Sequence, residues 1–375
     1  MIADAIGRHA EARLYLRPTA FVDAPFGLDG RAMRLAGGLI WFSAVEAIVV
    51  AGAARVAADL VPVDRLDDLL DRLPAPQRAA AGQTLARIVA PRPALTLGAR
   101  TVRLDQPQVM AILNMTPDSF SDGGRFADDP EGAAATAVAM AAEGAAIIDV
   151  GGESTRPRAA TVWEGDEIAR TVPVIGRLAR SGTAVSIDTR KAAVMEAALA
   201  AGAHLVNDVS ALLHDERAAA VVAAAGCPVV LMHHQGTPQT MQDAPAYGDA
   251  LIEVYDWLER RIAAAVAAGI DRSRILVDPG IGFGKAVRHS LALLNGLSLF
   301  HGLGCPIVLG ASRKRVIGAL SHEAPVEKRL GGSVALALAG AMQGVQMLRV
   351  HDVVETVQAI RVWRGLRDQA LTPVA

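Results

Sequence analysis

One unit repeats along this chain from residue 109 onward and limits the folds that the chain can adopt. In each repeat an alanine-rich stretch of helical character ends at a glycine, and a short apolar run begins within a few residues. Glycine adopts the left-handed conformation that a tight turn after a helix requires. Seven such turns introduce seven predicted strands, and the run at 109–113 adds an eighth. The glycines are Gly144, Gly182, Gly202, Gly226, Gly269, Gly304 and Gly344.

The apolar runs have the character of strands in a parallel sheet. AIIDV, PVVLM and PIVLG are almost continuously apolar, as expected where both faces of a sheet are buried. The seven steps from Asn114 to Arg349 cover 235 residues, about 34 per unit. The spacing predicts an α/β fold, a (β/α)8 TIM barrel over about residues 109–365. The alternative is a doubly wound open sheet, but no G-x-G-x-x-G follows the first strand.

Residues 1–93 do not follow this repeat and are predicted to form an α+β extension. Segments 14–22 and 32–50 have strand character, and 63–73 and 76–89 have helical character. Two prolines at 91 and 93 mark the boundary, so that 94–375 form the barrel domain. The alternating run 94–105 predicts a hairpin that closes the bottom of the barrel. We assign no chemistry to the extension and expect it to pack on the barrel or to mediate assembly.

Composition and charge exclude several classes of protein. Hydrophobic residues make up 52% of the chain and charged residues 20%, which indicates a globular protein with a large core. A net charge of −2 gives no reason to expect binding to nucleic acid or to an anionic membrane. Cys227 and Cys305 precede predicted strands and are expected to be buried, with no disulfide scaffold or zinc site. No signal peptide or membrane-spanning stretch is evident, so we expect a soluble cytoplasmic protein.

Each predicted strand leads to polar or charged residues. In a parallel barrel all strand ends meet on one face, so these residues are expected to form an active site there. They are Asn114, Asp149, Asp188, Asn207, Asp208, His233, Asp278, Ser312 and Arg349.

Three of these residues suit a flat heterocycle. Asp188, Asn207 and Asp278 come from different strands, and carboxylates paired with an amide match a row of NH donors along a ring edge. The alternative interpretation is that they cap the helices that follow.

Other residues suit an anion. Arg156 follows a Gly-Gly turn, Arg313 and Lys314 follow the seventh strand, and Arg349 and His351 flank the end of the eighth. Barrels often bind phosphate beside their last two strands, and arginine matches phosphate oxygens with two parallel hydrogen bonds. These positions predict a phosphate site.

Mg²⁺ prefers oxygen ligands and often shares them with a phosphate group, which makes Asn114 the candidate metal ligand.

Lysine is rare in this chain, and two of its positions support the site. The lysines are Lys191, Lys285, Lys314 and Lys328, whereas Lys and Arg together total 37. Of these four, Lys285 and Lys314 are the two that support a site. Lys285 lies in the glycine-rich run DPGIGFGK, whose spacing differs from that of a Walker P-loop.

Loops 116–126 and 154–165 are long and polar, which suits lids that close over a substrate. Phe120 in the first lid is a candidate apolar contact. Phe283, in the sixth loop, is a candidate for stacking on an aromatic ligand.

Eight motifs in order resemble those of the dihydropteroate synthase family. They are ILNMTPDSFSDGG, IIDVGGESTRP, SIDT, ND, LMH, DPGIGFGK, GASRK and RVHD. The resemblance covers about residues 94–365 and leaves the extension unexplained.

The resemblance implies a Mg²⁺-dependent transferase, commonly a homodimer. Such an enzyme joins 6-hydroxymethyl-7,8-dihydropterin diphosphate to 4-aminobenzoate and releases diphosphate. It also implies which residues bind each part of the substrates. Asp188, Asn207, Asp278 and Lys314 would hold the pterin, with Met232 lining its pocket. Asn114, Thr155, Arg156, Arg349 and His351 would hold the diphosphate and the metal. Ser312, Phe283 and the Lys314 stem would form the 4-aminobenzoate slot, completed by Phe120 and Asp122.

Two residues depart from the family pattern, and two other functions remain open. Arg158 stands where glycine is common, and His234 replaces a frequent methionine; we expect a structural or solvent role for His234. One rival function is a catalytically silent pterin-binding paralogue. The other is a methyltetrahydrofolate–corrinoid methyltransferase, in which Arg156 and Arg349 would have no diphosphate to bind.

Overall fold

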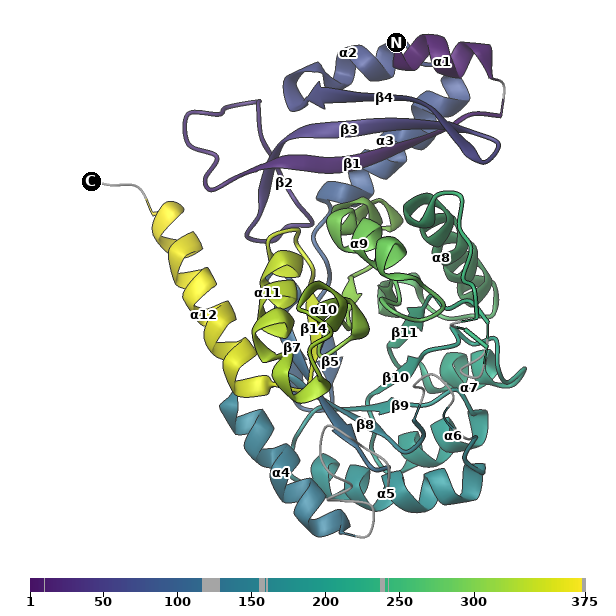
Figure 1. Cartoon of the computed structure of the whole chain (residues 1–375), viewed down its shortest axis with the longest axis vertical. Helices are drawn as coiled ribbons and strands as arrows, with labels where there is room; N and C mark the ends of the chain where they lie inside the picture. The colour runs from purple at the N-terminus through teal and green to yellow at the C-terminus, as the bar shows by residue number, and fades with distance from the viewer. Residues whose placement is uncertain are drawn as a thin grey trace.

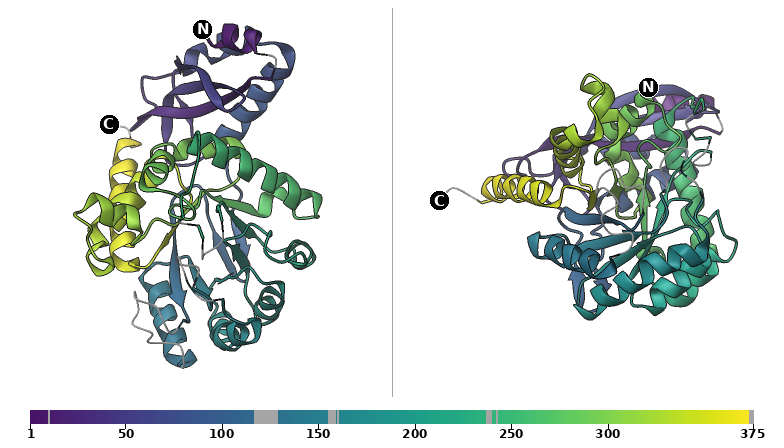
Figure 2. Two further views of the ribbon diagram at one scale, coloured as in Figure 1. Left: turned by 45° about the vertical axis from the view of Figure 1, so that its right-hand side comes forward. Right: turned by 60° about the horizontal axis from the view of Figure 1, so that its bottom comes forward.

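The computed structural model describes residues 1–9, 11–116, 129–154, 159, 161–236, 240–241 and 243–372. An α+β extension stands at one end of the molecule and a barrel forms the rest (Figure 1). The left view of Figure 2 shows the same arrangement, with the extension above the barrel.

The predicted barrel is present. In the described chain eight parallel strands form one sheet, with neighbours in the order β12-β11-β10-β9-β8-β7-β14-β13. A parallel bridge between Val277 and Ile307 joins the two ends of that order and closes the barrel. The strands are β7 (Gln108–Asn114), β8 (Ile147–Gly151), β9 (Val185–Asp188), β10 (Leu205–Asp208), β11 (Val229–Met232), β12 (Ile275–Asp278), β13 (Val308–Leu309) and β14 (Met347–Val350). Because β13 is so short, Ser312 lies in the loop beyond it.

Helices surround the strands, and the signals that predicted their ends are confirmed. All seven turn glycines have positive φ, which only glycine adopts without strain. Asp129 caps α4 by accepting a hydrogen bond from the Gly132 amide at 2.8 Å, with Pro130 as the first helical residue. The helices are α4 (Pro130–Glu143), α5 (Glu164–Arg180), α6 (Ala192–Ala200), α7 (Ala218–Ala225), α8 (Ala250–Ala267), η2 (Arg272–Arg274), α9 (Val287–Asn295), η3 (Leu297–Leu303), α10 (Arg315–Leu320), η4 (Val326–Lys328), α11 (Leu330–Ala341) and α12 (Val353–Ala370).

A hairpin closes the bottom of the barrel, as the alternating run predicted. It pairs β5 (Leu95–Leu97) with β6 (Arg100–Val102). Leu95, Leu97 and Val102 pack in one buried cluster with residues from the starts of the barrel strands, among them Met110 and Ile147. Since this end is filled by apolar side chains, the opposite end is the one open to a substrate.

The extension is a four-stranded antiparallel sheet with helices on one face. Its strands are β1 (Arg13–Val22), β2 (Met33–Arg34), β3 (Trp41–Ala51) and β4 (Ala54–Pro62); its helices are α1 (Ile2–Arg8), η1 (Val63–Arg65), α2 (Leu66–Asp71) and α3 (Ala75–Val89). The predicted strand at 32–50 is two strands separated by a turn. The sequence did not predict α1 or β4. β4 is an edge strand whose residues are mostly exposed, so burial imposed no pattern on it.

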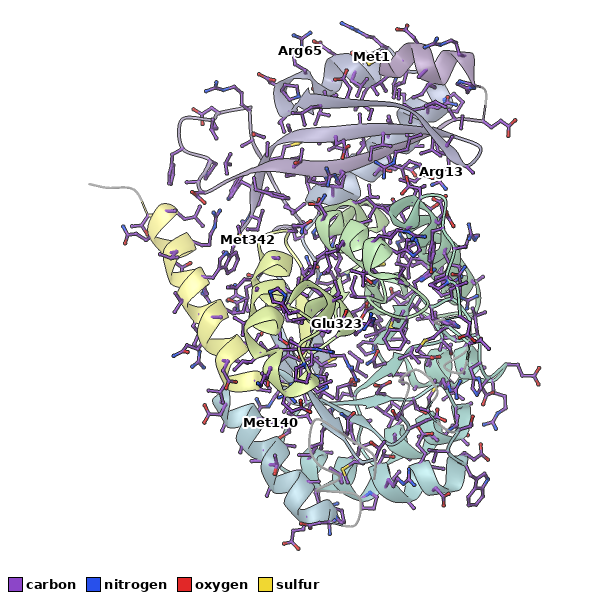
Figure 3. All side chains as sticks on the ribbon, viewed as in Figure 1. Met1, Arg13, Arg65, Met140, Glu323 and Met342 are labelled. Carbon is purple, nitrogen blue, oxygen red and sulfur yellow. The ribbon has the colours of Figure 1, made fainter. Side chains whose placement is uncertain are left out.

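The other face of the extension sheet packs on the barrel. Tyr15, Ile48 and Val50 from this sheet are part of the main core of the barrel. The Tyr15 ring meets Tyr255 of α8 edge-on, with 5.5 Å between centroids. Arg13, which is labelled in Figure 3, pairs with Asp256 and Glu259 of the same helix. Among the described residues, no helix combines the length and apolar character needed to cross a membrane.

Candidate active site

Arg349 of β14 ties together acidic residues from two other strands. Its Nε donates to Asp149 Oδ2 and its Nη2 donates to Asp188 Oδ2, both at 2.6 Å. Asn207 Nδ2 donates to the same Asp149 oxygen at 2.9 Å. Four side chains from β8, β9, β10 and β14 thus form one network on the carboxyl face, where the strand ends were predicted to meet.

A second group of residues surrounds Gly310, which follows β13. A Cβ at this glycine would lie 3.5 Å from Asp278 Oδ2, 3.9 Å from Lys314 Nζ and 4.0 Å from Arg349 Cβ. The absence of a side chain at residue 310 therefore leaves room beside the Asp278 carboxylate, the Lys314 ammonium and the Arg349 stem. Asp278 also accepts a hydrogen bond from the Gly280 amide at 2.7 Å, which holds the loop after β12 against the site.

Lys314 is held by the loop that follows β12. Its ammonium donates to the Ile281 carbonyl and lies 4.4 Å from the centre of the Phe283 ring. Such a cation–π contact stabilises the charge and fixes the ring. Phe283 and the Lys314 stem therefore form one wall of the site, next to Asp278.

Burial shifts the pKa values of the acids and of the lysine in opposite directions. Burial raises the pKa of Asp188 to about 7, although the Arg349 charge opposes the rise. Burial lowers the pKa of Lys314 to about 8, against the attraction of the Asp278 carboxylate. Burial also raises the pKa of Asp278, against the effect of Lys314. An acid and a base with such values are typical of functional sites.

Lys285 lies inside the protein. Its side chain is 3% exposed, and Nζ lies 2.8 Å from His233 Nδ1 and donates to the Phe283 carbonyl at 3.0 Å. Burial and the nearby Lys314 charge hold the pKa of Lys285 well below its usual range. Burial together with Lys285 lowers the pKa of His233 to about 2. The lysine thus joins the end of β11 to the loop after β12.

His351 and Arg313 follow the last two strands but contact different residues. His351 Nδ1 lies 3.1 Å from Ser312 Oγ, and this oxygen also accepts from the His351 amide at 3.2 Å. Arg313 turns toward Asp352, to which Nε donates at 3.1 Å. The predicted substrate contacts of Arg313 and Lys285 stay predictions, because in this structure both hold other parts of the protein.

Comparison with known proteins identifies the family of this chain. The model of the pterin binding enzyme family matches residues 110–351. The chain belongs to the pterin-binding enzyme family. Within this family it is 46% identical over 270 residues to the dihydropteroate synthase of Neisseria meningitidis serogroup B, a match that covers 71% of this chain and 94% of that protein.

Solved structures of pterin-binding enzymes resemble the barrel closely. The Yersinia pestis dihydropteroate synthase in complex with a sulfonamide drug has a TM-score of 0.71 and 45% identity over 73% of this chain and 99% of its own. The Xanthomonas albilineans dihydropteroate synthase with 4-aminobenzoic acid has a TM-score of 0.69 and 46% identity, covering 75% and 100% of the two chains. The family match begins after the extension.

Several predicted site residues of this pterin-binding enzyme lie outside the described residues. They are Phe120, Asp122, Thr155, Arg156 and the departure at Arg158. Their roles stay predictions, as do the two lids that contain them. The other predicted residues are described, and Met232 is buried at the end of β11, on the strand between Asn207 and Asp278.

The sequence did not predict the role of Asp149. We noted it among the polar strand residues but gave it no task. It is fully buried within β8, and its Oδ1 has no hydrogen-bond partner in the described structure. The signal was an ionisable residue inside the apolar run IIDV, because a buried carboxylate is retained only where it is paired.

Other polar residues at strand ends hold the backbone. Asp208 accepts from the amides of Ser210 and Leu212 at 2.7 and 2.8 Å, which holds the turn that follows β10. Lys191 pairs with Glu167 at 2.6 Å and with Glu153 at 3.2 Å, so it stabilises the second and third loops.

The magnesium ion at Asn114 stays a prediction, and the donor atoms near Asn114 are consistent with it. A Cβ at Gly151 would lie 3.7 Å from Asp188 Oδ2 and 3.9 Å from Asn114 Oδ1, so both oxygens border one open position. The part of the chain that is described holds no cluster of three His, Cys, Asp or Glu side chains suited to a metal. A single side-chain oxygen with phosphate and water oxygens suits Mg²⁺, whereas zinc would require more protein ligands.

Proposed function

We propose that this chain condenses 6-hydroxymethyl-7,8-dihydropterin diphosphate with 4-aminobenzoate to form 7,8-dihydropteroate and diphosphate, as a dihydropteroate synthase. The observation that carries the proposal is the Arg349 network, in which one cation and two acids lie at the mouth of the barrel. Arg349 serves a diphosphate, and Asp188 of this network serves a pterin ring with several NH donors.

The acidic residues bind the pterin. Asp188 and Asp278 accept hydrogen bonds from ring NH groups, and the Asn207 amide has both a donor and an acceptor. Because Asp188 and Asn207 are paired in register on neighbouring strands, their side chains point to the same side of the sheet. Lys314 beside Asp278 provides a donor for a ring carbonyl or nitrogen.

The reaction breaks the bond between the pterin methylene carbon and the diphosphate oxygen. Diphosphate leaves with the electron pair, and positive charge develops on the methylene and the attached ring. In this proposal Arg349 and His351 stabilise the leaving group, while Asp188 and Asp278 stabilise the positive charge. The amine nitrogen of 4-aminobenzoate then forms the new bond to carbon and releases a proton.

Phe283 and Lys314 position the amine. The ring and the lysine stem form an apolar wall beside the site. Ser312, two residues before Lys314, contacts His351. Holding a weak nucleophile close to the carbon supplies much of the rate enhancement in such a condensation. When bound, Mg²⁺ would neutralise diphosphate charge, with Asn114 as its protein ligand.

One assay tests the proposal. The protein is mixed with both substrates and Mg²⁺, and release of diphosphate is measured together with formation of dihydropteroate. We expect both products in equal amounts, and no diphosphate release when 4-aminobenzoate is omitted. If neither product forms, the chain is the silent pterin-binding paralogue.

The cytoplasmic location and the homodimer stay predictions. Val354, Val362 and Leu366 are more than half exposed and follow one another along one side of α12, which supports a contact with a second copy. Light scattering of the purified protein tests this expectation.

A further inference from the structure

The extension touches the catalytic face of the barrel at one arginine. Arg55, at the start of β4, donates to Asp249 from Nε at 2.5 Å and from an Nη at 3.2 Å. Asp249 is the N-cap of α8 and accepts from the Leu251 amide at 3.2 Å. Because barrel helices begin at the carboxyl face, this ion pair lies on the side of the active site.

Asp249 ends the loop that follows β11, and this loop contacts the next one. Two residues before Asp249, the Tyr247 hydroxyl donates to the Gly284 carbonyl at 2.9 Å. The Tyr247 ring meets His289 of α9 edge-on, with 4.8 Å between centroids. The two loops approach so closely that a Cβ at Gly284 would lie 2.3 Å from the Gln235 carbonyl oxygen.

Gly284 follows Phe283, which forms the wall of the site with Lys314. A continuous series of contacts therefore runs from Arg55 through Asp249 and Tyr247 to this wall. Every link is a hydrogen bond, an ion pair or a chain connection of at most two residues.

We propose that Arg55 is a positioning residue through which the extension fixes the wall that receives 4-aminobenzoate. The inference rests on the proposed function for the identity of the substrate, and it gives residues 1–93 a task in the reaction. Arg55 acts by holding the end of the β11–α8 loop, so that Tyr247 keeps the Phe283 loop in place.

A second arginine of the extension binds acids on the same helix and offers a matched control. Arg13 also belongs to the extension and pairs with Asp256 and Glu259 at 3.0 and 2.9 Å, but these acids lie well beyond the first turn of α8. Arg55→Gln therefore removes one ion pair between extension and barrel and releases the loop, whereas Arg13→Gln removes two ion pairs and leaves the loop held.

Steady-state kinetics of the full chain separates the two effects. We expect Arg55→Gln to raise the KM for 4-aminobenzoate about fivefold, the size of effect expected for a partly exposed ion pair, with kcat changed less than twofold. Arg13→Gln should leave both constants unchanged, and Arg55→Lys should restore most of the affinity. Equal KM values in wild type and Arg55→Gln, in an active enzyme, would overturn the inference.

A double-mutant cycle tests the path. If Arg55 acts through Tyr247, the effect of Arg55→Gln on KM is much smaller in a Tyr247→Phe background, whereas independent effects would multiply. Multiplying effects would show that Arg55 does not act through Tyr247 and would overturn the proposed path.

Hydrogen exchange provides a readout that does not depend on catalysis. In Arg55→Gln the amides of residues 280–286 should exchange faster than in the wild type, and in Arg13→Gln they should not. Unchanged exchange in Arg55→Gln contradicts the positioning role even if the enzyme acts on a different substrate. Failure of the proposed function would instead appear as a wild type with no turnover.

Discussion

Arg349 donates to Asp188 at 2.6 Å across the mouth of the barrel, from a strand that follows β9 by more than 150 residues. Asp188 has to bind a pterin NH and Arg349 a diphosphate oxygen in the proposed reaction. The two residues therefore pair before substrate binds, and in the proposed reaction each of them also contacts a substrate group.

Loss of either residue of this pair should nearly abolish turnover. Arg349→Ala removes a cation from the leaving group, and Asp188→Ala removes the acceptor for the pterin; we expect kcat/KM to fall at least about 10²-fold in each. Diphosphate release measures the effect, and thermal unfolding confirms that the variants are folded. Near-normal turnover in both variants would rule out the assigned site.

The pH profile of kcat/KM should be bell-shaped. Asp188 has a pKa of about 7 and must be ionised to accept from the pterin, so activity should rise through that pH. Lys314 has a pKa of about 8 and must be protonated, so activity should fall above it. Lys314→Arg provides the check: the guanidinium keeps its charge, so the alkaline fall should disappear. A wild-type profile that is flat from pH 6 to 9 would contradict both assignments.

Asn114→Ala should weaken the binding of magnesium. The substitution removes the proposed protein ligand, so a higher Mg²⁺ concentration, about tenfold, should be needed for half-maximal rate. Titrating the rate with MgCl₂ after treatment with a chelator measures this. An unchanged titration curve would mean that Asn114 does not bind the metal.

His234→Met should leave turnover within about twofold. The His234 ring packs edge-on against Trp257 at 6.0 Å, and its Nδ1 has no hydrogen-bond partner in the described structure. Burial lowers the pKa of His234 to about 4, so it is neutral at pH 7 and methionine can fill its place. A large loss of kcat would instead give His234 a task in the pterin pocket.

Tyr15→Ala should loosen the extension from the barrel. The ring is 3% exposed within the main core, so its removal should lower the free energy of unfolding by about 3 kcal/mol. Tyr15→Phe, which loses only the hydroxyl bonds to Asp256, should lower it by about 1 kcal/mol. Urea unfolding measures both. An early transition of the extension, with barrel stability unchanged, would show that the two parts unfold separately.

The repeat predicted the barrel because each βα unit is local. Where the helix signals and the apolar run stood side by side in the sequence, as at Asp129 and Gly144, the structure agrees. Local signals failed at β4, which an exposed edge position leaves without an alternating pattern. They also failed within 32–50, where the apolar composition did not reveal the turn between β2 and β3.

The sequence by itself determined on which side of the barrel the polar strand ends lie, because the carboxyl ends of parallel strands share one side of a barrel. Only the tertiary structure decided how those residues pair. In the folded protein Arg349 pairs with Asp149 and Asp188, Arg313 pairs with Asp352, and Lys285 contacts His233. The tertiary structure also placed Arg55 on Asp249, so that the extension reaches the catalytic face. Partners that lie far apart in the chain leave no periodic pattern in either segment, and their contact exists only once the barrel has closed and the extension has packed against it.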